Sequence, residues 1–194
     1  MAYDALINTY RHFAPLLPEE EKMLMEIFKP YNLKKGEYFL KSGEQSKNVA
    51  FLNKGLVCYY VNKNDEMSIT DFSKEGEFVS EYHTFLHKSP AIHSIKCLED
   101  SEFLKADYDG IQRLYTEFKY GDRFGRCILE HRFGIVVNQL ISSNMHSPEM
   151  RYQIFLKDYF EISQRIPQYL MAAFIGVQAP SLSRIRKRQN KSIY

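Results

Sequence analysis

The 194-residue chain contains no tryptophan and only three cysteines, Cys58, Cys97 and Cys127. The cysteines lie far apart, are odd in number, and none belongs to a C-x-x-C pair. This pattern argues against a disulfide framework, a zinc site, and a haem or iron–sulfur sensor. Free cysteine is one of the most often buried residue types. We therefore expect three small buried side chains in a reducing compartment.

Long apolar runs are also missing. No run of 18 or more apolar residues occurs, which predicts that no segment spans a membrane. The opening segment, MAYDALINTYRHF, lacks the basic stretch and apolar core of a secretory signal. Apolar residues nevertheless make up 44% of the chain, enough to bury a core. These features predict a cytoplasmic protein.

Acidic residues are absent from the C-terminal stretch 163–194. This stretch carries six basic residues, whereas the remainder holds 20 basic and 24 acidic ones. A mildly acidic body with a basic end is typical of a protein that binds phosphate groups. The alternative is a solvated basic tail that binds nothing.

Residues 31–107 have the pattern of an all-β segment. Short runs with β character, such as LVCYYV (56–61) and SITDF (68–72), alternate with turn signals such as NKND (62–65). Glycines mark further turns at Gly36, Gly43, Gly55 and Gly76. Near-regular spacing of short strands predicts a barrel or sandwich. The preceding residues 1–29 are expected to be helical, with Pro18 and three glutamates in one first turn.

Residues 108–144 return to a helical pattern. A first short helix is predicted by apolar residues at helical spacing, namely Ile111, Leu114, Tyr115 and Phe118. A narrow seam then recurs every three or four residues, at Phe124, Ile128, His131 and Ile135. A narrow seam on a long helix favours pairing between subunits. Packing against the chain's own β domain is the alternative.

The stretch 166–188, IPQYLMAAFIGVQAPSLSRIRKR, predicts two short helices and a tight turn. Pro167 and Pro180 can each open a helix, and Gly176 permits the positive φ of a sharp turn. The first helix has an apolar side at Leu170, Ala173 and Phe174. Leu182 and Ile185 anchor the second helix, and its outward side chains are polar, as in a helix-turn-helix. The outward set consists of Gln178, Ser181, Ser183, Arg184, Lys187 and Arg188.

Three motifs resemble the Crp/Fnr family of bacterial regulators. They are LKKGEYFLKSGEQSKNVAFLNKG (33–55), EGEFVSE (75–81) and the stretch 166–188. The string LSRIRK (182–187) resembles variants common in Bacteroidetes members. The resemblance implies an α+β chain with a double-stranded β-roll, or jelly roll, in a cyclic-nucleotide-binding-like domain with N-terminal helices (1–110). A long dimerisation helix (111–144) and a helix-turn-helix DNA-binding domain that is winged-helix-like (145–194) would follow.

The same resemblance implies roles for individual residues. Arg184 matches an arginine that contacts bases, and Ser181 a hydroxyl that touches phosphate. Pro180 stands where some members have a base-reading glutamate, so the preferred DNA sequence should differ. The implied partners are double-stranded DNA and a second copy of the chain. RNA polymerase is the further partner that gene activation would require, and no membrane is involved.

The ligand pocket departs from the family. It is expected around residues 78–82 and 92–93, namely Phe78, Val79, Ser80, Glu81, Tyr82, Ile92 and His93. Members that bind cyclic AMP use Gly-Glu-Leu and then an Arg-Ser pair about ten residues on. Here the first segment is Ser80-Glu81-Tyr82, and Ala91-Ile92 replaces the pair. The cyclic phosphate then loses its bidentate partner, for which Lys88 or His93 is only a partial substitute. We expect another small-molecule effector, or none.

The sequence gives less support to three other functions: metal binding, enzymatic activity and ligand sensing through protein contacts. His83, His87 and His93 lie near Glu81, but their spacing matches no metal site, so we expect no metal and no cofactor. A cupin-like metal enzyme would share the jelly roll, yet an H-x-H pair and a Ser/His/Asp or Cys/His constellation are absent. We therefore predict that the protein is not an enzyme. A ligand-sensing module that acts through protein contacts is the other alternative, and salt-sensitive DNA binding distinguishes it.

Overall fold

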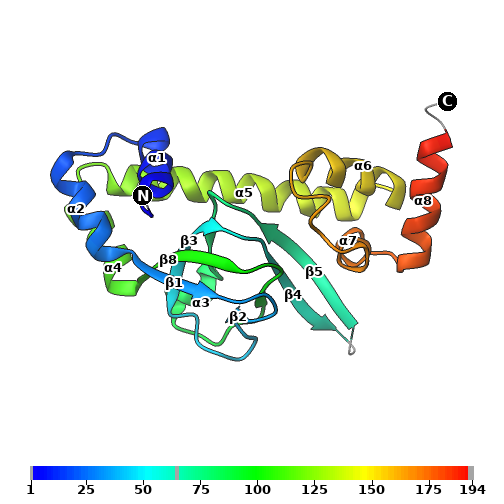
Figure 1. Cartoon of the computed structure of the whole chain (residues 1–194), viewed down its shortest axis with the longest axis horizontal. Helices are drawn as coiled ribbons and strands as arrows, with labels where there is room; N and C mark the ends of the chain where they lie inside the picture. Colours follow the sequence, from blue (N-terminus) through cyan, green and yellow to red (C-terminus); the bar gives the residue numbers. More distant parts are fainter. Residues whose placement is uncertain (1, 64–65, 192–194) are drawn as a thin grey trace. The chain divides into compact units, whose positions relative to one another are not determined.

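The computed structural model describes residues 2–63 and 66–191 and contains eight helices and eight strands within them (Figure 1). The chain divides into two compact units. The first comprises Met1–Tyr59 with Phe72–Arg132, and the second comprises Tyr60–Asp71 with Phe133–Tyr194. None of the described helices is both long and apolar enough to cross a membrane.

Two four-stranded sheets form the β-roll. The first has the order β1 (Lys29–Leu33), β8 (Ser101–Asp107), β3 (Asn48–Lys54), β6 (Phe78–Val79). The second has the order β2 (Tyr38–Leu40), β7 (Ser94–Cys97), β4 (Val57–Lys63), β5 (Glu66–Ser73). Strands far apart in sequence pair antiparallel, with Phe51 of β3 opposite Leu104 of β8. The predicted β-roll is therefore confirmed.

Helices precede and follow the strands of the β-roll, and one short helix lies between β6 and β7. They are α1 (Asp4–Phe13), α2 (Pro18–Ile27), α3 (Tyr82–His87), α4 (Tyr108–Glu117) and the long α5 (Gly121–Met145). The ring of Tyr10 in α1 stacks on Phe124 in α5, with centroids 4.3 Å apart. Both rings belong to a core that also takes in Phe51 and Leu104. The start of α5 is thus fixed by the apolar core of the first unit.

A buried carboxylate joins two of these helices. Glu20 in α2 is only 3% exposed. Its two oxygens accept hydrogen bonds from the backbone N–H of Leu17 (2.8 Å) and of Lys119 (2.7 Å). A buried carboxylate needs such donors, because an unpaired one costs several kcal/mol. Glu20 therefore both caps α2 and holds the turn between α4 and α5.

The cysteines follow their prediction only in part. Cys58 and Cys97 are each 1% exposed, whereas Cys127 on α5 is half-buried. Burial raises the pKa of both the Cys58 and the Cys97 thiol to about 11. All three thiols are free. The two buried ones are neutral packing groups at physiological pH.

The second unit contains the C-terminal helices α6 (Pro148–Asp158), α7 (Gln168–Ile175) and α8 (Ala179–Lys191). Ser147 caps α6, since its hydroxyl accepts the backbone N–H of Met150. The rings of Phe155 and Phe174 form its core with Tyr159. Residues 159–165 form turns, and no strand follows β8 in the described part of the chain. The predicted helix-turn-helix is therefore present without wing strands in that part.

Candidate functional site

The turn between α7 and α8 is the feature that the sequence predicted most sharply. Gly176 ends α7 with φ 76° and ψ 38°, in the left-handed region that glycine enters without a Cβ clash. The Gly176 N–H donates to the carbonyl of Ala173, and the Val177 N–H donates to that of Ala172. These bonds satisfy the last carbonyls of α7. The predicted turn glycine is confirmed.

The apolar side of α7 was predicted less well. Leu170 is buried as expected, but Ala173 and Phe174 are only half-buried. The other fully buried positions are Met171, Ala172 and Ile175. The reason is that α7 is apolar around most of its circumference. Helical spacing alone therefore cannot identify which apolar side chains of α7 are buried.

The second helix, α8, divides into a buried and an exposed face. Leu182 and Ile185 are 1% and 4% exposed, which confirms them as anchors. The preceding Gln178 accepts the first N–H bonds of α8 on its carbonyl, from Ser181 and Leu182. Of the six predicted DNA-contacting residues only Ser181 is half-buried, and the exposed ones are Gln178, Ser183, Arg184, Lys187 and Arg188. The helix therefore presents a polar, basic face with no acidic residue.

Two arginines of α8 are turned toward other parts of the second unit. A guanidinium nitrogen of Arg188 lies 3.6 Å from a carboxylate oxygen of Glu149 on α6. Arg186 is half-buried and lines a cavity of about 170 Å³ with Gln164 and Gln168. The exposed basic pair Arg184 and Lys187 is therefore the part of this face that the described contacts leave for a ligand.

Arg151 on α6 was missed by sequence reasoning. Its Nε donates to the carbonyl of Ile175 at 2.7 Å, and its Nη1 donates to that of His146 at 3.1 Å. The side chain thus binds the C-terminal end of α7, next to the turn glycine, and the residue that follows α5. A cation at a helix C-terminus is also favoured by the helix dipole. Sequence gives no signal for it, because its partners are backbone carbonyls.

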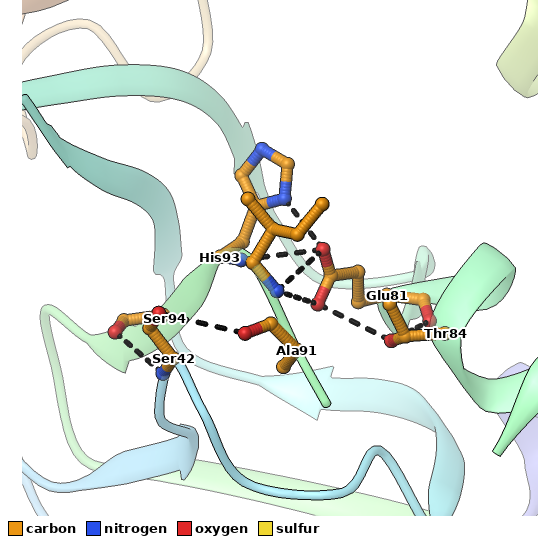
Figure 2. A network of polar contacts seen from close by, with 7 residues as sticks. Ser42, Glu81, Thr84, Ala91, His93 and Ser94 are labelled. Atoms are coloured by element: carbon orange, nitrogen blue, oxygen red, sulfur yellow. Dashed lines mark hydrogen bonds and ion pairs between the residues drawn. The ribbon is translucent and has the colours of Figure 1, made fainter. Parts of the chain in front are cut away.

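Glu81, one of the residues predicted to line a ligand pocket in the β-roll, is the centre of a cluster of hydrogen bonds (Figure 2). The Glu81 carboxylate accepts hydrogen bonds from the backbone N–H groups of Ile92 and His93, at 3.0 to 3.2 Å. Nδ1 of His93 lies 2.8 Å from Oε1, and the Thr84 hydroxyl donates to Oε2 at 3.2 Å. The Glu81 side chain is 11% exposed. Four donor groups on three residues therefore surround one carboxylate.

Phe78, Val79 and Ser80, three of the other predicted pocket residues, are held by different contacts, and Ile92 joins the cluster only through its backbone N–H. Val79 is fully buried in the core, and Phe78 packs against the rings of Phe51 and Phe124. The Ser80 hydroxyl donates to the carbonyl of Asn48, and the Ile92 side chain is 64% exposed. Phe78 and Val79 form the two-residue strand β6, in which neighbouring side chains point to opposite faces, whereas Ser80 and Ile92 lie outside the strands.

The residues around Glu81 do not fit an anionic cyclic phosphate. The backbone N–H groups that could hold such an anion already bind the Glu81 carboxylate. Residues 91 and 92 are Ala and Ile, which supply no charge. A second anion at this position would meet the first one without a guanidinium to separate them.

The histidines form no metal cluster within the described residues. His83 and His87 share one face of α3, with ring centroids 4.6 Å apart, as their spacing predicted. His93 is held by Glu81 instead. No group of three or more His, Cys, Asp or Glu side chains that could hold a metal ion occurs across 2–63 and 66–191.

The seam predicted on α5 is only partly open to a partner. Phe124 is 4% exposed and Ile128 packs against the same core, whereas His131 is exposed and Ile135 half-buried. The alternative reading, packing against the chain's own β domain, therefore holds for the first two. The apolar side chains that α5 leaves exposed are a different set, Leu129, Phe133, Val136, Leu140, Ile141 and Met145.

The Tyr82–Tyr115 pair links α3 to α4 and reaches α5. Their hydroxyl groups lie 3.0 Å apart. The Tyr115 ring packs on Gly125 of α5 so closely that a Cβ at Gly125 would lie 2.3 Å from a ring carbon. Burial, followed by the contact with Tyr82, raises the pKa of the Tyr115 hydroxyl. The residue after Glu81 is thus connected to the long helix.

Comparison with known proteins supports this architecture. Residues 30–118 match the family model of the cyclic nucleotide-binding domain. The chain is similar in structure to FixK2 from Bradyrhizobium japonicum, with a TM-score of 0.75, 11% identity, and 86% of each chain covered. For a mutant of CooA from Carboxydothermus hydrogenoformans the TM-score is 0.74 and the identity 13%, over 99% of this chain and 85% of that one. Comparison with curated proteins gives no match.

A third similar structure is the c-di-GMP responsive global regulator CLP from Xanthomonas campestris. Its TM-score is 0.72 at 14% identity, over 88% of this chain and 90% of that one. At such identities the likeness establishes the fold. The predicted order of β-roll, long helix and C-terminal helices is therefore confirmed.

Proposed function

We propose that the protein is a DNA-binding transcription regulator. The observation that carries the proposal is the exposed face of α8, which presents Arg184 and Lys187 from a helix anchored by Leu182 and Ile185. This helix follows a tight turn and a short helix, as in proteins that place a second helix in the major groove. The cyclic nucleotide-binding-like domain and the regulators of similar fold support the same assignment.

The face of α8 has groups for both kinds of DNA contact. The planar guanidinium of Arg184 can bind O6 and N7 of guanine together, and the Gln178 amide can do the same for adenine. Ser183 and Lys187 are suited to phosphate oxygens, which fix register without reading sequence. We assign Arg188 a smaller role, because its guanidinium is near Glu149.

The proposed assembly is a dimer of two copies joined along α5. Leu129, Phe133, Val136 and Leu140 recur at intervals of four, three and four residues, which is the heptad spacing of a coiled coil. They are 42%, 71%, 53% and 63% exposed in the single chain. A second copy would bury them, and a two-fold dimer would favour a two-fold symmetric DNA site.

Selection from random duplex DNA tests this proposal. Wild-type protein is expected to enrich a two-fold symmetric site, and Arg184→Ala is expected to relax the preference at one base pair of each half-site. The matched control is Arg113→Ala, which removes an exposed arginine from α4 in the first unit. Enrichment should survive in the control.

The competing function is a ligand-sensing module that contacts another protein through its C-terminal helices. It predicts no enriched DNA site and weak DNA binding at every salt concentration. RNA polymerase is the additional partner that we propose if the regulator activates transcription.

A further inference from the structure

The Glu81 carboxylate occupies a receptor made of donors from another segment of the chain. Those donors are the N–H groups of Ile92 and His93 and the His93 imidazole, with the Thr84 hydroxyl on the helix side. Two successive backbone N–H groups converging on one point form a site for an anion. Hydrogen bonds to the charged form of a carboxylate stabilise that form.

The receptor is held in place by contacts that do not involve Glu81. The Gly43 N–H donates to the carbonyl of Ala91 at 2.8 Å, and the Ala91 N–H donates to that of Glu44 at 2.7 Å. The Ser42 N–H donates to the Ser94 hydroxyl at 3.0 Å (Figure 2). The loop that carries Ile92 and His93 is therefore pinned on both sides, so its N–H groups keep their direction if the carboxylate is removed.

We propose that this receptor is an anion-binding site whose ligand is the chain's own Glu81. Because the glutamate is tethered, its effective concentration at the site is about millimolar or higher, and a free anion must compete with it. The wild-type domain therefore binds neither small carboxylates nor a cyclic phosphate here. This inference rests on the proposed function in one respect only, namely that the regulator then acts without a cyclic nucleotide.

A chain of side-chain contacts connects the residue next to Glu81 with α5. Tyr82 follows Glu81 directly, and its hydroxyl lies 3.0 Å from that of Tyr115. The Tyr115 ring rests on Gly125 of α5. A change of occupant that moves the start of α3 would reach the long helix through these contacts.

Removing the tethered ligand tests the proposal in the full-length protein. Glu81→Ala deletes one methylene and the carboxylate, which are the atoms of acetate, so acetate should refill the receptor. We expect acetate, compared with chloride at equal ionic strength, to raise the Tm of this variant by about 3–6 °C at roughly ten times its dissociation constant. Propionate should be less effective because its extra carbon meets the alanine Cβ. Inorganic phosphate tests whether a larger anion is accepted.

Three controls separate this effect from a general salt effect. Wild type and Glu102→Ala, which loses an exposed carboxylate of β8, should show no acetate-specific shift. The double variant Glu81→Ala/His93→Ala should respond less than Glu81→Ala alone. Amide NMR should show that the Ile92 and His93 signals move in Glu81→Ala and return toward their wild-type positions with acetate.

The outcomes do not depend on DNA. An acetate-specific Tm rise confined to Glu81→Ala supports the proposal, even if no DNA site is ever enriched. No response in a folded Glu81→Ala overturns it, as does saturable binding of cyclic AMP or acetate by wild type. If Glu81→Ala does not fold, Glu81→Gln is the second variant. It keeps the side-chain volume but places an amide NH₂, itself a donor, opposite one of the backbone N–H donors. Unchanged Ile92 and His93 amide signals in Glu81→Gln would then overturn the proposal.

Discussion

The hydroxyl of Tyr159 donates a 2.7 Å hydrogen bond to Oδ1 of Asp71, which is 7% exposed. Nε2 of Gln139 donates to the same oxygen at 3.2 Å and to the Tyr159 hydroxyl at 3.0 Å. Asp71 lies on β5, Gln139 on α5, and Tyr159 directly after α6. One buried carboxylate thus connects three elements of the second unit.

The first prediction concerns this connection. Tyr159→Phe removes only the hydroxyl and leaves Asp71 with one charge-assisted bond fewer, so the free energy of unfolding should fall by about 1–3 kcal/mol. Urea denaturation measures the change. Tyr169→Phe is the control, because Tyr169 is 62% exposed and its loss of a hydroxyl should be nearly neutral. Equal effects for the two variants would contradict the assigned role.

Arg151 provides the second prediction. Arg151→Met keeps the apolar stem but removes the guanidinium that binds the carbonyls of Ile175 and His146. Stability of the second unit should fall by about 1.5–3 kcal/mol, since hydrogen bonds from a charged donor are involved. Hydrogen exchange should increase around Gly176. Arg126→Met, at an exposed arginine of α5, should change neither quantity by a comparable amount.

Two glycines on α5 give opposite expectations for the same substitution. At Gly125 a Cβ would lie 2.3 Å from the Tyr115 ring, so Gly125→Ala should destabilise the fold by about 1–3 kcal/mol. At Gly134 nothing lies within 4 Å, so Gly134→Ala should stabilise the helix by about 0.5–1 kcal/mol. Thermal unfolding distinguishes the two signs. The same sign for both would contradict the packing of Tyr115 on α5.

Among the four side chains proposed to form the dimer interface, Phe133 is the most exposed in the single chain, at 71%. Phe133→Asp should raise the dimer dissociation constant at least about 100-fold, because each copy loses roughly 1.5–3 kcal/mol of apolar burial and gains a charge at the interface. Sedimentation equilibrium measures the constant. Met150→Asp, at a 46% exposed position of α6, should leave it unchanged. A dimer that persists in Phe133→Asp would exclude this stripe as the interface.

The sequence predicts the parts of the site that depend on local backbone geometry. The turn at Gly176 needs a positive φ, and the anchors Leu182 and Ile185 follow from helical spacing, so both are visible in a short string of residues. The role of Glu81 is not visible in this way. Its donors are backbone N–H groups eleven and twelve residues away, and any residue type except proline could provide them.

The exposed stripe of α5 shows a second limit of sequence reasoning. The predicted seam from Phe124 to Ile135 and the exposed series from Leu129 to Leu140 have the same heptad spacing. Spacing gives the period, but the face that meets the β-roll depends on tertiary packing, here the stacking of Tyr10 on Phe124. The contacts of Arg151 could not be predicted from sequence either, because one acceptor is the backbone carbonyl of Ile175, which lies far along the chain.

The salt dependence of DNA binding tests the central claim most directly. Binding of wild type and Lys187→Ala to one selected duplex would be measured by fluorescence anisotropy from about 50 to 200 mM salt, where each phosphate contact contributes roughly −0.9 to the slope of log K against log[salt]. If α8 binds DNA, the slope for wild type should be steep and negative, and in Lys187→Ala it should become shallower by the contribution of about one phosphate contact. A slope near zero, or one that Lys187→Ala leaves unchanged, would contradict DNA binding through the exposed face of α8.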